Sequence, residues 1–156
     1  MEKIITSTSP EQTQDVAFLI GKQLKGGEII ELVSDLGGGK TTFVRGMAKG
    51  AGSNEKVASP SFTISKVYKA GRLTIYHFDF YRLSDPGVVE YELLDVAGAP
   101  DTVTVIEWPI IIEHDLPADR LIAEFKLGAS ENMRQLIFNY PKSLSYLLAI
   151  DADTND

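Results

Sequence analysis

Cysteine is missing from this 156-residue sequence, and histidine occurs only twice, as His77 and His114. A chain without cysteine forms no disulfide and offers no thiolate to zinc or to an iron–sulfur cluster. It also has no cysteine nucleophile. With only two histidines, a histidine-rich metal site is disfavoured as well. These absences exclude several common kinds of site before any motif is considered.

Long apolar runs and targeting signals are also missing. Residues 1–10 lack the basic stretch followed by an apolar run that marks a secretory signal peptide. No segment approaches the roughly 20 apolar residues that a helix needs to cross a bilayer. The sequence therefore predicts a cytoplasmic protein that does not associate with membranes.

Positive charge is in short supply. Lysine and arginine total 15 against 22 aspartates and glutamates, which gives a formal net charge of −7. A protein that grips a phosphate backbone by itself usually carries a basic surface. The charge balance therefore disfavours direct binding to DNA or to RNA.

The length and composition suit one folded domain. Hydrophobic residues make up 44% of the chain and charged residues 24%, as in ordinary globular proteins. We expect one domain over residues 1–150. Residues 151–156 are acidic and poor in apolar side chains, so we expect them to form a disordered tail.

Apolar periodicity and turn residues predict an α/β fold. Ser9 and Pro10 are typical of a helix start, and Gly26 and Gly27 of its end. Further helices are expected over 41–50, 88–94 and 141–150, and strands over 28–33, 64–68, 73–80, 102–106, 121–127 and 135–139. This order predicts a single P-loop NTPase-like domain, in which helices flank a mixed, mainly parallel sheet with antiparallel additions.

A glycine-rich segment lies between an expected buried strand and an expected helix. It reads Ser-Asp-Leu-Gly-Gly-Gly-Lys-Thr-Thr over residues 34–42. The Walker A loop, which cradles nucleotide phosphates, requires G-x-x-x-x-G-K-[ST] between a strand and a helix. Gly39, Lys40 and Thr41 fit the second half of this pattern, whereas Ser34 replaces the first glycine. The strand–loop–helix context favours a phosphate site over a glycine-rich turn that binds nothing.

Each residue type in this loop has a physical task. The glycines of residues 37–39 let backbone N–H groups approach a phosphate without side-chain clashes. The start of the following helix adds free N–H groups and a positive dipole end. Lys40 supplies positive charge to the β- and γ-phosphates, and the Thr41 hydroxyl is placed to coordinate magnesium. Asp35 either orients the loop or contacts an attacking water, and the sequence leaves both roles open.

A phosphate loop of this kind needs a carboxylate near the magnesium ion, usually at the end of a neighbouring apolar strand. Glu107 ends the β-branched run 102–106, and this arrangement favours a functional role. Asp79 lies near the end of the expected strand 73–80. Acids also gather at strand ends because they are disfavoured inside strands, so the residues alone leave the role of Asp79 open.

Three neighbours of these acids have patterns that fit more than one role. Trp108 follows Glu107 and either stacks on adenine or fills a gap between sheet and helix, and residue type alone favours packing. His77 alternates with its strand neighbours and is interpreted as structural. Arg82 is either a charge that faces the phosphates or a surface residue, and residue type alone favours the surface.

Four segments match the motifs of one family, beginning with the glycine loop. Residues 35–43 resemble the family pattern D-L-G-A-G-K-T-T-F. Gly38 stands where the pattern has alanine, and Ser34 stands where it has a preceding glycine.

The other three segments are spread over the chain. Residues 57–62 resemble V-x-S-P-T-F, with Ser61 where threonine is usual, and residues 77–83 resemble H-x-D-x-Y-R-L. Residues 106–109 contain the E-W segment. On these motifs the sequence resembles the TsaE family (also called YjeE), the ATPases of bacterial tRNA threonylcarbamoyladenosine biosynthesis.

The resemblance implies a small ATPase that uses ATP or ADP and Mg²⁺. It implies that ATP binding and hydrolysis reset or license a transfer performed by two partners, TsaD and TsaB, with TsaD placing the threonylcarbamoyl group on an adenosine beside the anticodon. The chain would reach tRNA only through these partners, in keeping with its acidic charge. Hydrolysis by the chain alone is expected to be weak.

The resemblance also implies a set of site residues. The implied nucleotide-binding residues are Asp35, Leu36, Gly37, Gly38, Gly39, Lys40, Thr41, Thr42 and Trp108. The implied catalytic residues are Lys40, Asp79 and Glu107, and the implied metal ligands are Thr41, Glu107 and Asp79. The implied switch residues, which would sense the γ-phosphate or a partner, are Ser59, Pro60, Ser61 and Phe62.

Two other hypotheses share the phosphate loop. A small-molecule kinase would need an acceptor pocket and usually a cationic lid, and the basic residues after residue 107 are scattered rather than clustered. A non-enzymatic module would use nucleotide only to stabilise an interaction surface. The intact Lys40 and Thr41, with two candidate acids, argue against the non-enzymatic module.

Overall fold

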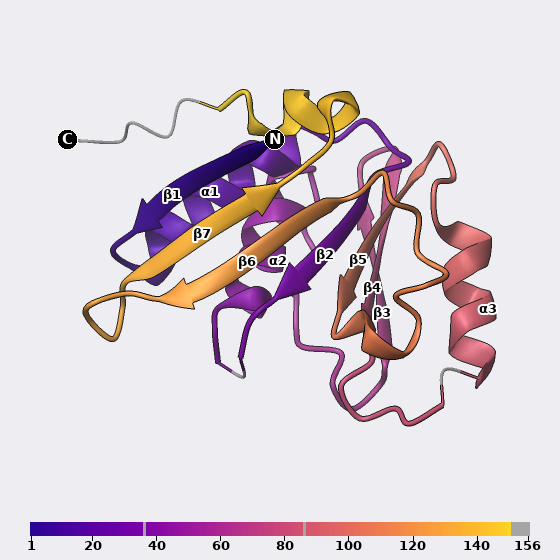
Figure 1. The fold of residues 1–156 in the computed structure, drawn as a ribbon. Helices are drawn as coiled ribbons and strands as arrows, with labels where there is room; N and C mark the ends of the chain where they lie inside the picture. The colour runs from indigo at the N-terminus through magenta and orange to yellow at the C-terminus, as the bar shows by residue number, and fades with distance from the viewer. Residues whose placement is uncertain (36, 86, 151–156) are drawn as a thin grey trace.

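The protein is described by a computed structural model that covers residues 1–35, 37–85 and 87–150. Seven strands form one twisted sheet in the order β1-β7-β6-β2-β5-β4-β3 (Figure 1). The strands are β1 (Glu2–Ser7), β2 (Ile29–Val33), β3 (Ser65–Ala70), β4 (Leu73–Asp79), β5 (Thr102–Glu107), β6 (Leu121–Leu127) and β7 (Arg134–Asn139). The helices are α1 (Pro10–Gln23), α2 (Lys40–Gly50), α3 (Gly87–Val96) and the 3₁₀ segments η1 (Pro109–Ile111) and η2 (Lys142–Leu148).

The centre of the sheet is parallel and its edges are antiparallel. Parallel pairing joins β6 to β2, β2 to β5 and β5 to β4. Antiparallel pairing adds β7 and β1 at one edge and β3 at the other. The β3–β4 hairpin turns through Gly71 and Arg72, between the two strands that the sequence predicts over 64–68 and 73–80. The predicted mixed α/β fold is confirmed.

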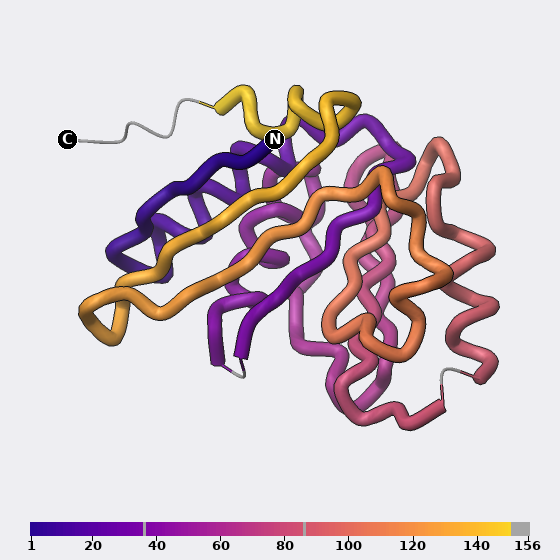
Figure 2. Tube along the Cα trace, viewed as in Figure 1, coloured from indigo at the N-terminus to yellow at the C-terminus, as the bar shows by residue number. Residues whose placement is uncertain are grey.

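Helices cover both faces of the sheet. α1 and α2 pack on one face, where the larger apolar core contains Ile20, Phe43, Ile75, Val105 and Phe138. α3 and the segment that follows η1 cover the other face through a smaller core around Phe78, Leu93 and Ile106. Figures 1 and 2 show α1 and α2 behind the sheet and α3 on the opposite side. Since both faces are covered, the central strands are apolar on both sides.

Glycine allows α1 and α2 to pack closely. A Cβ on Gly46 of α2 would overlap the backbone carbonyl of Gln14, and one on Gly50 would overlap that of Phe18. Likewise, a Cβ on Gly21 of α1 would overlap the backbone carbonyl of Met47 in α2. The two helices therefore touch backbone to backbone, which fixes how α2 lies on the sheet.

Two elements differ from the sequence-based expectation. The sequence predicts no strand before residue 9, yet residues 2–7 form β1. The apolar pattern of these residues is weak, and antiparallel hydrogen bonding to β7 stabilises the strand. The helix expected over 141–150 is instead the 3₁₀ segment η2. Leu144 and Leu147 lie three residues apart and both are buried, a spacing that suits three residues per turn. The tail expected over 151–156 lies outside the described residues.

The parallel strands also determine where a site can form. The carboxyl ends of β2, β5 and β4 meet at one edge, at the bottom of Figure 1. The loop between β2 and α2 and the turns after β4 and β5 descend to the same edge in Figure 2. Within the described ranges, no helix is long and apolar enough to cross a membrane.

The core packing of α2 leads to a prediction about stability. The Phe43 ring is fully buried, with its centroid 5.3 Å from that of Phe125. Phe43→Ala should lower the free energy of unfolding by about 3–5 kcal/mol, because it removes buried apolar contacts and leaves a cavity. Urea titration followed by circular dichroism measures this change. The matched control is Phe62→Ala, since Phe62 is 84% exposed; equal losses in the two variants would contradict the packing described.

Candidate functional site

The glycine loop leaves the buried strand β2 and enters α2 directly at Lys40. Gly37 and Gly39 have φ values of 77° and 104°, in the region that glycine adopts without strain. A Cβ on either residue would meet nothing within 4 Å, so their backbones face open space. A chain of bare backbone at a helix start is the arrangement that receives anions.

Beside the loop lies a cavity of about 260 Å³ at the edge where the strands end. It brings together residues from the loop, from the segment before β3 and from the ends of β4 and β5. Its lining consists of Gly37, Gly38, Gly39, Lys40, Thr41, Thr42, Ser59, Ser61, Asp79, Glu107 and Trp108. Every one of these is a predicted site residue.

The Lys40 ammonium is the buried positive charge of this cavity. The side chain is 6% exposed, and Nζ donates to the Ser34 hydroxyl at 2.8 Å. Longer bonds reach the carbonyls of Ser34 at 3.3 Å and Asp35 at 3.4 Å. Burial lowers the pKa of Lys40 below its usual value, and the negative charges of Glu107, Asp79 and Asp35 partly offset that effect.

Two buried acids face this lysine. Asp79 and Glu107 are each 4% exposed and pair directly across the parallel strands β4 and β5. Since side chains alternate along a strand, both acids share the face of the sheet that α2 covers. The structure therefore joins the two acids that the sequence considered separately.

Both oxygens of Asp79 are engaged by neighbouring segments. Oδ2 accepts a hydrogen bond from the Ser61 hydroxyl at 2.8 Å, and Oδ1 accepts one from the backbone N–H of Tyr81 at 2.9 Å. The Ser61 hydroxyl also lies 2.7 Å from that of Ser59. Asp79 thus connects the predicted switch segment to the end of β4.

Glu107 has a different partner. Its Oε1 lies 2.8 Å from Nε2 of His77, which is fully buried. Within the described ranges, Nδ1 of His77 has no hydrogen-bond partner. His77 is structural, as expected from its alternation, but it also holds a site carboxylate. His77 lies two residues before Asp79, so the two side chains share a face of the sheet. Because Glu107 pairs with Asp79 on that face, this spacing is the sequence signal for the contact between His77 and Glu107.

Trp108 lies on the lysine side of the site rather than in the core. Its ring is half-buried, and Nζ of Lys40 lies 5.0 Å from the ring centroid. The Tyr81 ring is 5.1 Å away. Trp108 has φ 54°, a left-handed conformation that non-glycine residues adopt at a cost and that recurs at functional sites. The residue-type preference for core packing is therefore corrected.

A second hollow of about 210 Å³ lies on the other side of the glycine loop. The turn between β6 and β7 contributes Asn132, the first residue of β7 contributes Arg134, and the start of α1 contributes Pro10 and Thr13. Nε of Arg134 donates to the carbonyl of Gly38 at 3.2 Å. Sequence reasoning missed these residues because they match no motif and lie far from the loop in the chain.

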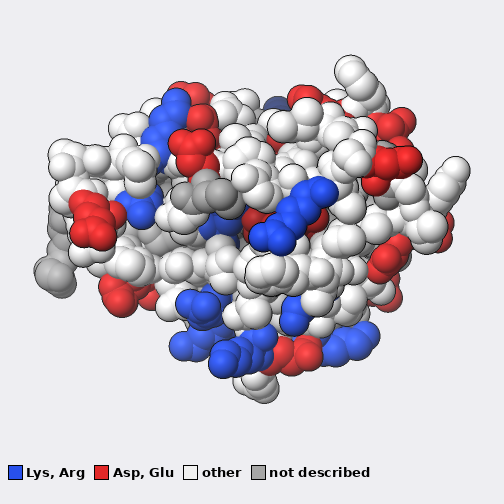
Figure 3. All heavy atoms as spheres, turned by 90° about the horizontal axis from the view of Figure 1, so that it is seen from below, with Lys and Arg blue, Asp and Glu red and all other residues white. Residues whose placement is uncertain are grey.

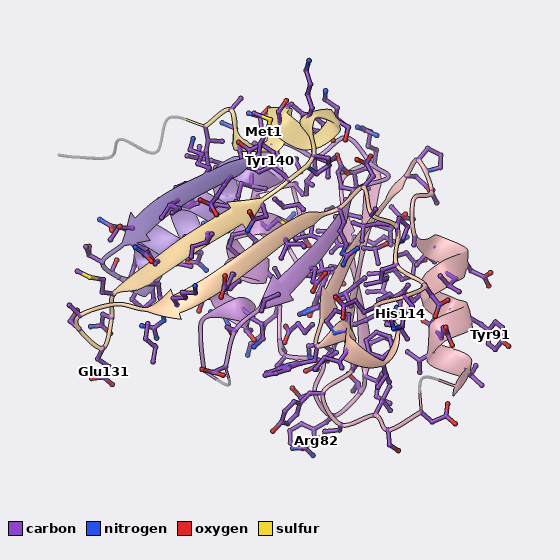
Figure 4. The ribbon with its side chains drawn as sticks, viewed as in Figure 1. Met1, Arg82, Tyr91, His114, Glu131 and Tyr140 are labelled. Carbon is purple, nitrogen blue, oxygen red and sulfur yellow. The ribbon has the colours of Figure 1, made fainter. Side chains whose placement is uncertain are left out.

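The remaining predicted residues lie outside the cavity lining. Asp35 is exposed and contributes its backbone carbonyl to Lys40. Pro60 is buried, and Phe62 points away into solvent beneath the guanidinium of Arg82, 4.7 Å from the ring centroid. Arg82 is exposed, as expected, and Figure 4 labels it at this lower end of the molecule. Leu36 lies outside the described residues.

The charge around this edge is mixed. Figure 3 looks onto it from below and shows lysine and arginine side chains near the middle and along one margin, with most acids toward the sides. The local surface is therefore less acidic than the net charge of −7 implies.

The oxygen donors of the cavity fit a phosphate-bound magnesium ion. Thr41, Asp79 and Glu107 supply the hard oxygen ligands that Mg²⁺ prefers. Among the residues that the structure describes, no group of three or more His, Cys, Asp or Glu side chains forms a metal cage. Magnesium sites in nucleotide-binding proteins use few protein ligands and complete their shell with phosphates and water, so the residues present fit such a site.

Together, the buried strand, the glycine loop, the helix that begins at Lys40 and the acids on neighbouring parallel strands define the P-loop class of α/β proteins. A profile of the family described as "Threonylcarbamoyl adenosine biosynthesis protein TsaE" matches residues 7–136. The chain belongs to the TsaE family, as its motifs predict.

Individual relatives agree with this assignment. The TsaE protein of Bacillus subtilis is 39% identical over 132 residues, covering 85% of this chain and 82% of that protein. TsaE of Rickettsia conorii is 39% identical over 132 residues, covering 84% and 74%. The crystal structure of YdiB from Bacillus subtilis matches with a TM-score of 0.76 and 34% identity, over 95% of this chain and 92% of that one.

The contact between His77 and Glu107 leads to a second prediction. His77→Leu should lower the free energy of unfolding by about 1–3 kcal/mol, because it leaves a buried carboxylate oxygen without a partner. The matched control is His114→Leu, since His114 is exposed and should contribute less than about 0.5 kcal/mol. Urea unfolding of both variants gives the comparison, and equal losses would show that the contact contributes nothing.

Proposed function

We propose that this chain binds ATP or ADP with Mg²⁺ in the cavity beside its glycine loop, and that it hydrolyses ATP as a component of tRNA threonylcarbamoyladenosine biosynthesis. One observation carries the proposal: Lys40, Thr41 and the buried acids Asp79 and Glu107 line a single cavity at the start of α2. We further propose that residues 1–150 act as one domain in the cytoplasm.

The loop and Lys40 bind the phosphates in this proposal. Residues 37–42 line the cavity, and the backbone N–H groups that are free at the start of α2 would donate to phosphate oxygens. The Lys40 ammonium has only neutral oxygen atoms as hydrogen-bond partners within the described ranges. A phosphate would compete well for it, since charge-assisted bonds are the stronger kind.

The two acids have different tasks. Mg²⁺ would supply charge that stabilises the transferred phosphoryl group. Thr41 and Glu107 are its preferred protein contacts, because His77 engages only one oxygen of Glu107. Each oxygen of Asp79 already accepts one hydrogen bond, so Asp79 would contact the ion or the attacking water through its remaining lone pairs while it stays bonded to Ser61 and Tyr81.

The second hollow suggests how the nucleotide lies. The loop separates the cavity of the acids from the hollow beside Asn132 and Arg134, and Gly37, Gly39 and Thr42 line both. We propose that the terminal phosphates face Asp79 and Glu107 while the nucleoside extends toward Arg134. Trp108 then contacts the lysine and terminal-phosphate end rather than the adenine.

The segment Ser59–Phe62 would report the state of the site. Ser61 contacts Asp79 directly, so a change at the metal or γ-phosphate would alter the bond that holds this segment. Phe62 follows at once and is 84% exposed. We propose that it presents the state of the site to TsaD and TsaB, through which the chain would reach tRNA.

Nucleotide binding is tested with a pair of lysine variants on α2. Lys40→Ala should weaken ADP binding by about tenfold to a hundredfold, because it removes a hydrogen bond to a charged group. Lys49→Ala is the matched control, since Lys49 is exposed on the same helix and should change affinity by no more than about twofold. Calorimetric titration with ADP and Mg²⁺ measures both. Wild-type affinity in a folded Lys40→Ala variant would refute the proposed phosphate site.

Hydrolysis is tested with and without the partners. We expect slow ATP turnover by the chain alone and faster turnover with TsaB and TsaD present. Asp79→Ala and Glu107→Ala should each lower the stimulated rate by about a hundredfold, the range of a lost acid–base or metal-positioning group. Asp101→Ala is the control, since this acid is exposed at the opposite end of β5. Bound nucleotide with no stimulation would instead favour a kinase or a passive module.

A further inference from the structure

Ser34 and Gly38 face one another across the glycine loop. Ser34 replaces the first glycine of the Walker A pattern, and Gly38 lies one residue before its last glycine. A Cβ built on Gly38 would lie 2.5 Å from the Cβ of Ser34 and closer still to its hydroxyl oxygen. Real Cβ atoms do not approach one another so closely, so the Ser34 side chain occupies the space that a side chain at 38 would need.

Space alone opposes a side chain at Gly38. Gly37 and Gly39 have positive φ values, where any side chain strains the backbone, but Gly38 is not among the positive-φ residues of the described chain. A positive φ therefore does not stand against alanine at this position. Glycine is therefore needed at positions 37 and 39 because of backbone conformation, and at position 38 because of crowding with Ser34.

The Ser34 hydroxyl is also the nearest hydrogen-bond partner of Lys40. It donates to the carbonyl of Asp35 at 2.8 Å and accepts from Nζ of Lys40 at 2.8 Å. The two carbonyl contacts of Nζ are longer, at 3.3 and 3.4 Å. The backbone N–H of Gly38 donates to the same Asp35 carbonyl at 3.1 Å, so the bonds form one network.

We propose that Ser34 and Gly38 form one packing unit, in which only one of the two positions can carry a side chain, and that this unit positions the Lys40 ammonium for the nucleotide. The inference rests on the proposed nucleotide site and deepens it by naming Ser34 as a positioning residue. The departure from glycine at position 34 and the presence of glycine at 38 are then one feature rather than two.

The proposal has a specific consequence for Gly38→Ala. The added methyl group must push Ser34 or the loop backbone aside, which displaces the loop that surrounds Lys40. Gly38→Ala should therefore weaken ADP binding by about tenfold, the usual size of overpacking at a crowded site.

A double substitution tests whether the crowding is the cause. Ser34→Gly combined with Gly38→Ala removes the opposing Cβ and should bring the affinity back to within about threefold of wild type, the remaining loss being that of the hydroxyl contact with Nζ. Ser34→Ala combined with Gly38→Ala is the matched control. Alanine at position 34 keeps the Cβ that the new methyl group would meet, so this pair should remain as weak as Gly38→Ala.

Two readouts keep the outcomes distinct. The affinity for ADP with Mg²⁺ is measured by calorimetry and by the fluorescence of Trp108, the one tryptophan of the chain, whose ring lies 5.0 Å from Nζ of Lys40. Melting temperatures of all variants are measured without nucleotide. Gly38→Ala should melt below wild type, and only the combination with Ser34→Gly should recover.

Recovery by Ser34→Gly, in affinity and in melting temperature, supports the packing unit. If wild type binds ADP and both double variants stay as weak as Gly38→Ala, the inference is wrong. It is also wrong if Gly38→Ala binds and melts like wild type. Absence of ADP binding in wild type would overturn the proposed function and the role of the unit in nucleotide binding, while the melting temperatures would still decide whether the two positions crowd each other.

Discussion

The site depends on the parallel pairing of β2, β5 and β4. This pairing brings the carboxyl ends of three strands to one edge and sets Asp79 directly beside Glu107. The same edge receives the start of α2, so the buried ammonium of Lys40 lies among acids that partly offset the cost of its burial. The close packing of α1 on α2, which glycine permits, holds that helix start in place. Loop, lysine and acids are therefore consequences of one sheet topology.

Asp79 connects the site to the segments around it through hydrogen bonds. Its carboxylate joins the Ser59–Phe62 segment to the turn after β4 through Ser61 and the N–H of Tyr81. Ile64, which ends this region, has φ 68°, an unusual conformation for a β-branched residue. Its carbonyl accepts from the N–H of Asp79 at 2.8 Å. This unusual conformation beside a segment bonded to a site acid supports our proposal that Ser59–Phe62 acts as a switch.

Crowding inside the glycine loop explains how a departure from a motif can be tolerated. By the Walker A pattern, Ser34 is a mismatch at a single position. In the folded loop, however, position 34 lies next to position 38. A side chain gained at one position fits because the other has none. The Ser34 hydroxyl then also becomes a partner for Lys40, so the substitution adds a contact as well as volume.

The α/β class, most of the elements and the phosphate loop could be predicted from the sequence alone, because these depend on local periodicity and on contiguous motifs. The sequence singled out Glu107 as functional and left Asp79 open until the family motifs were compared. Which residues come into contact depends on how the chain folds in three dimensions. The pairing of Asp79 with Glu107, the contact of His77 and the approach of Arg134 to Gly38 join residues far apart in the chain. The edge strand β1 exists through its pairing with β7, and periodicity within a segment carries no information about its partner.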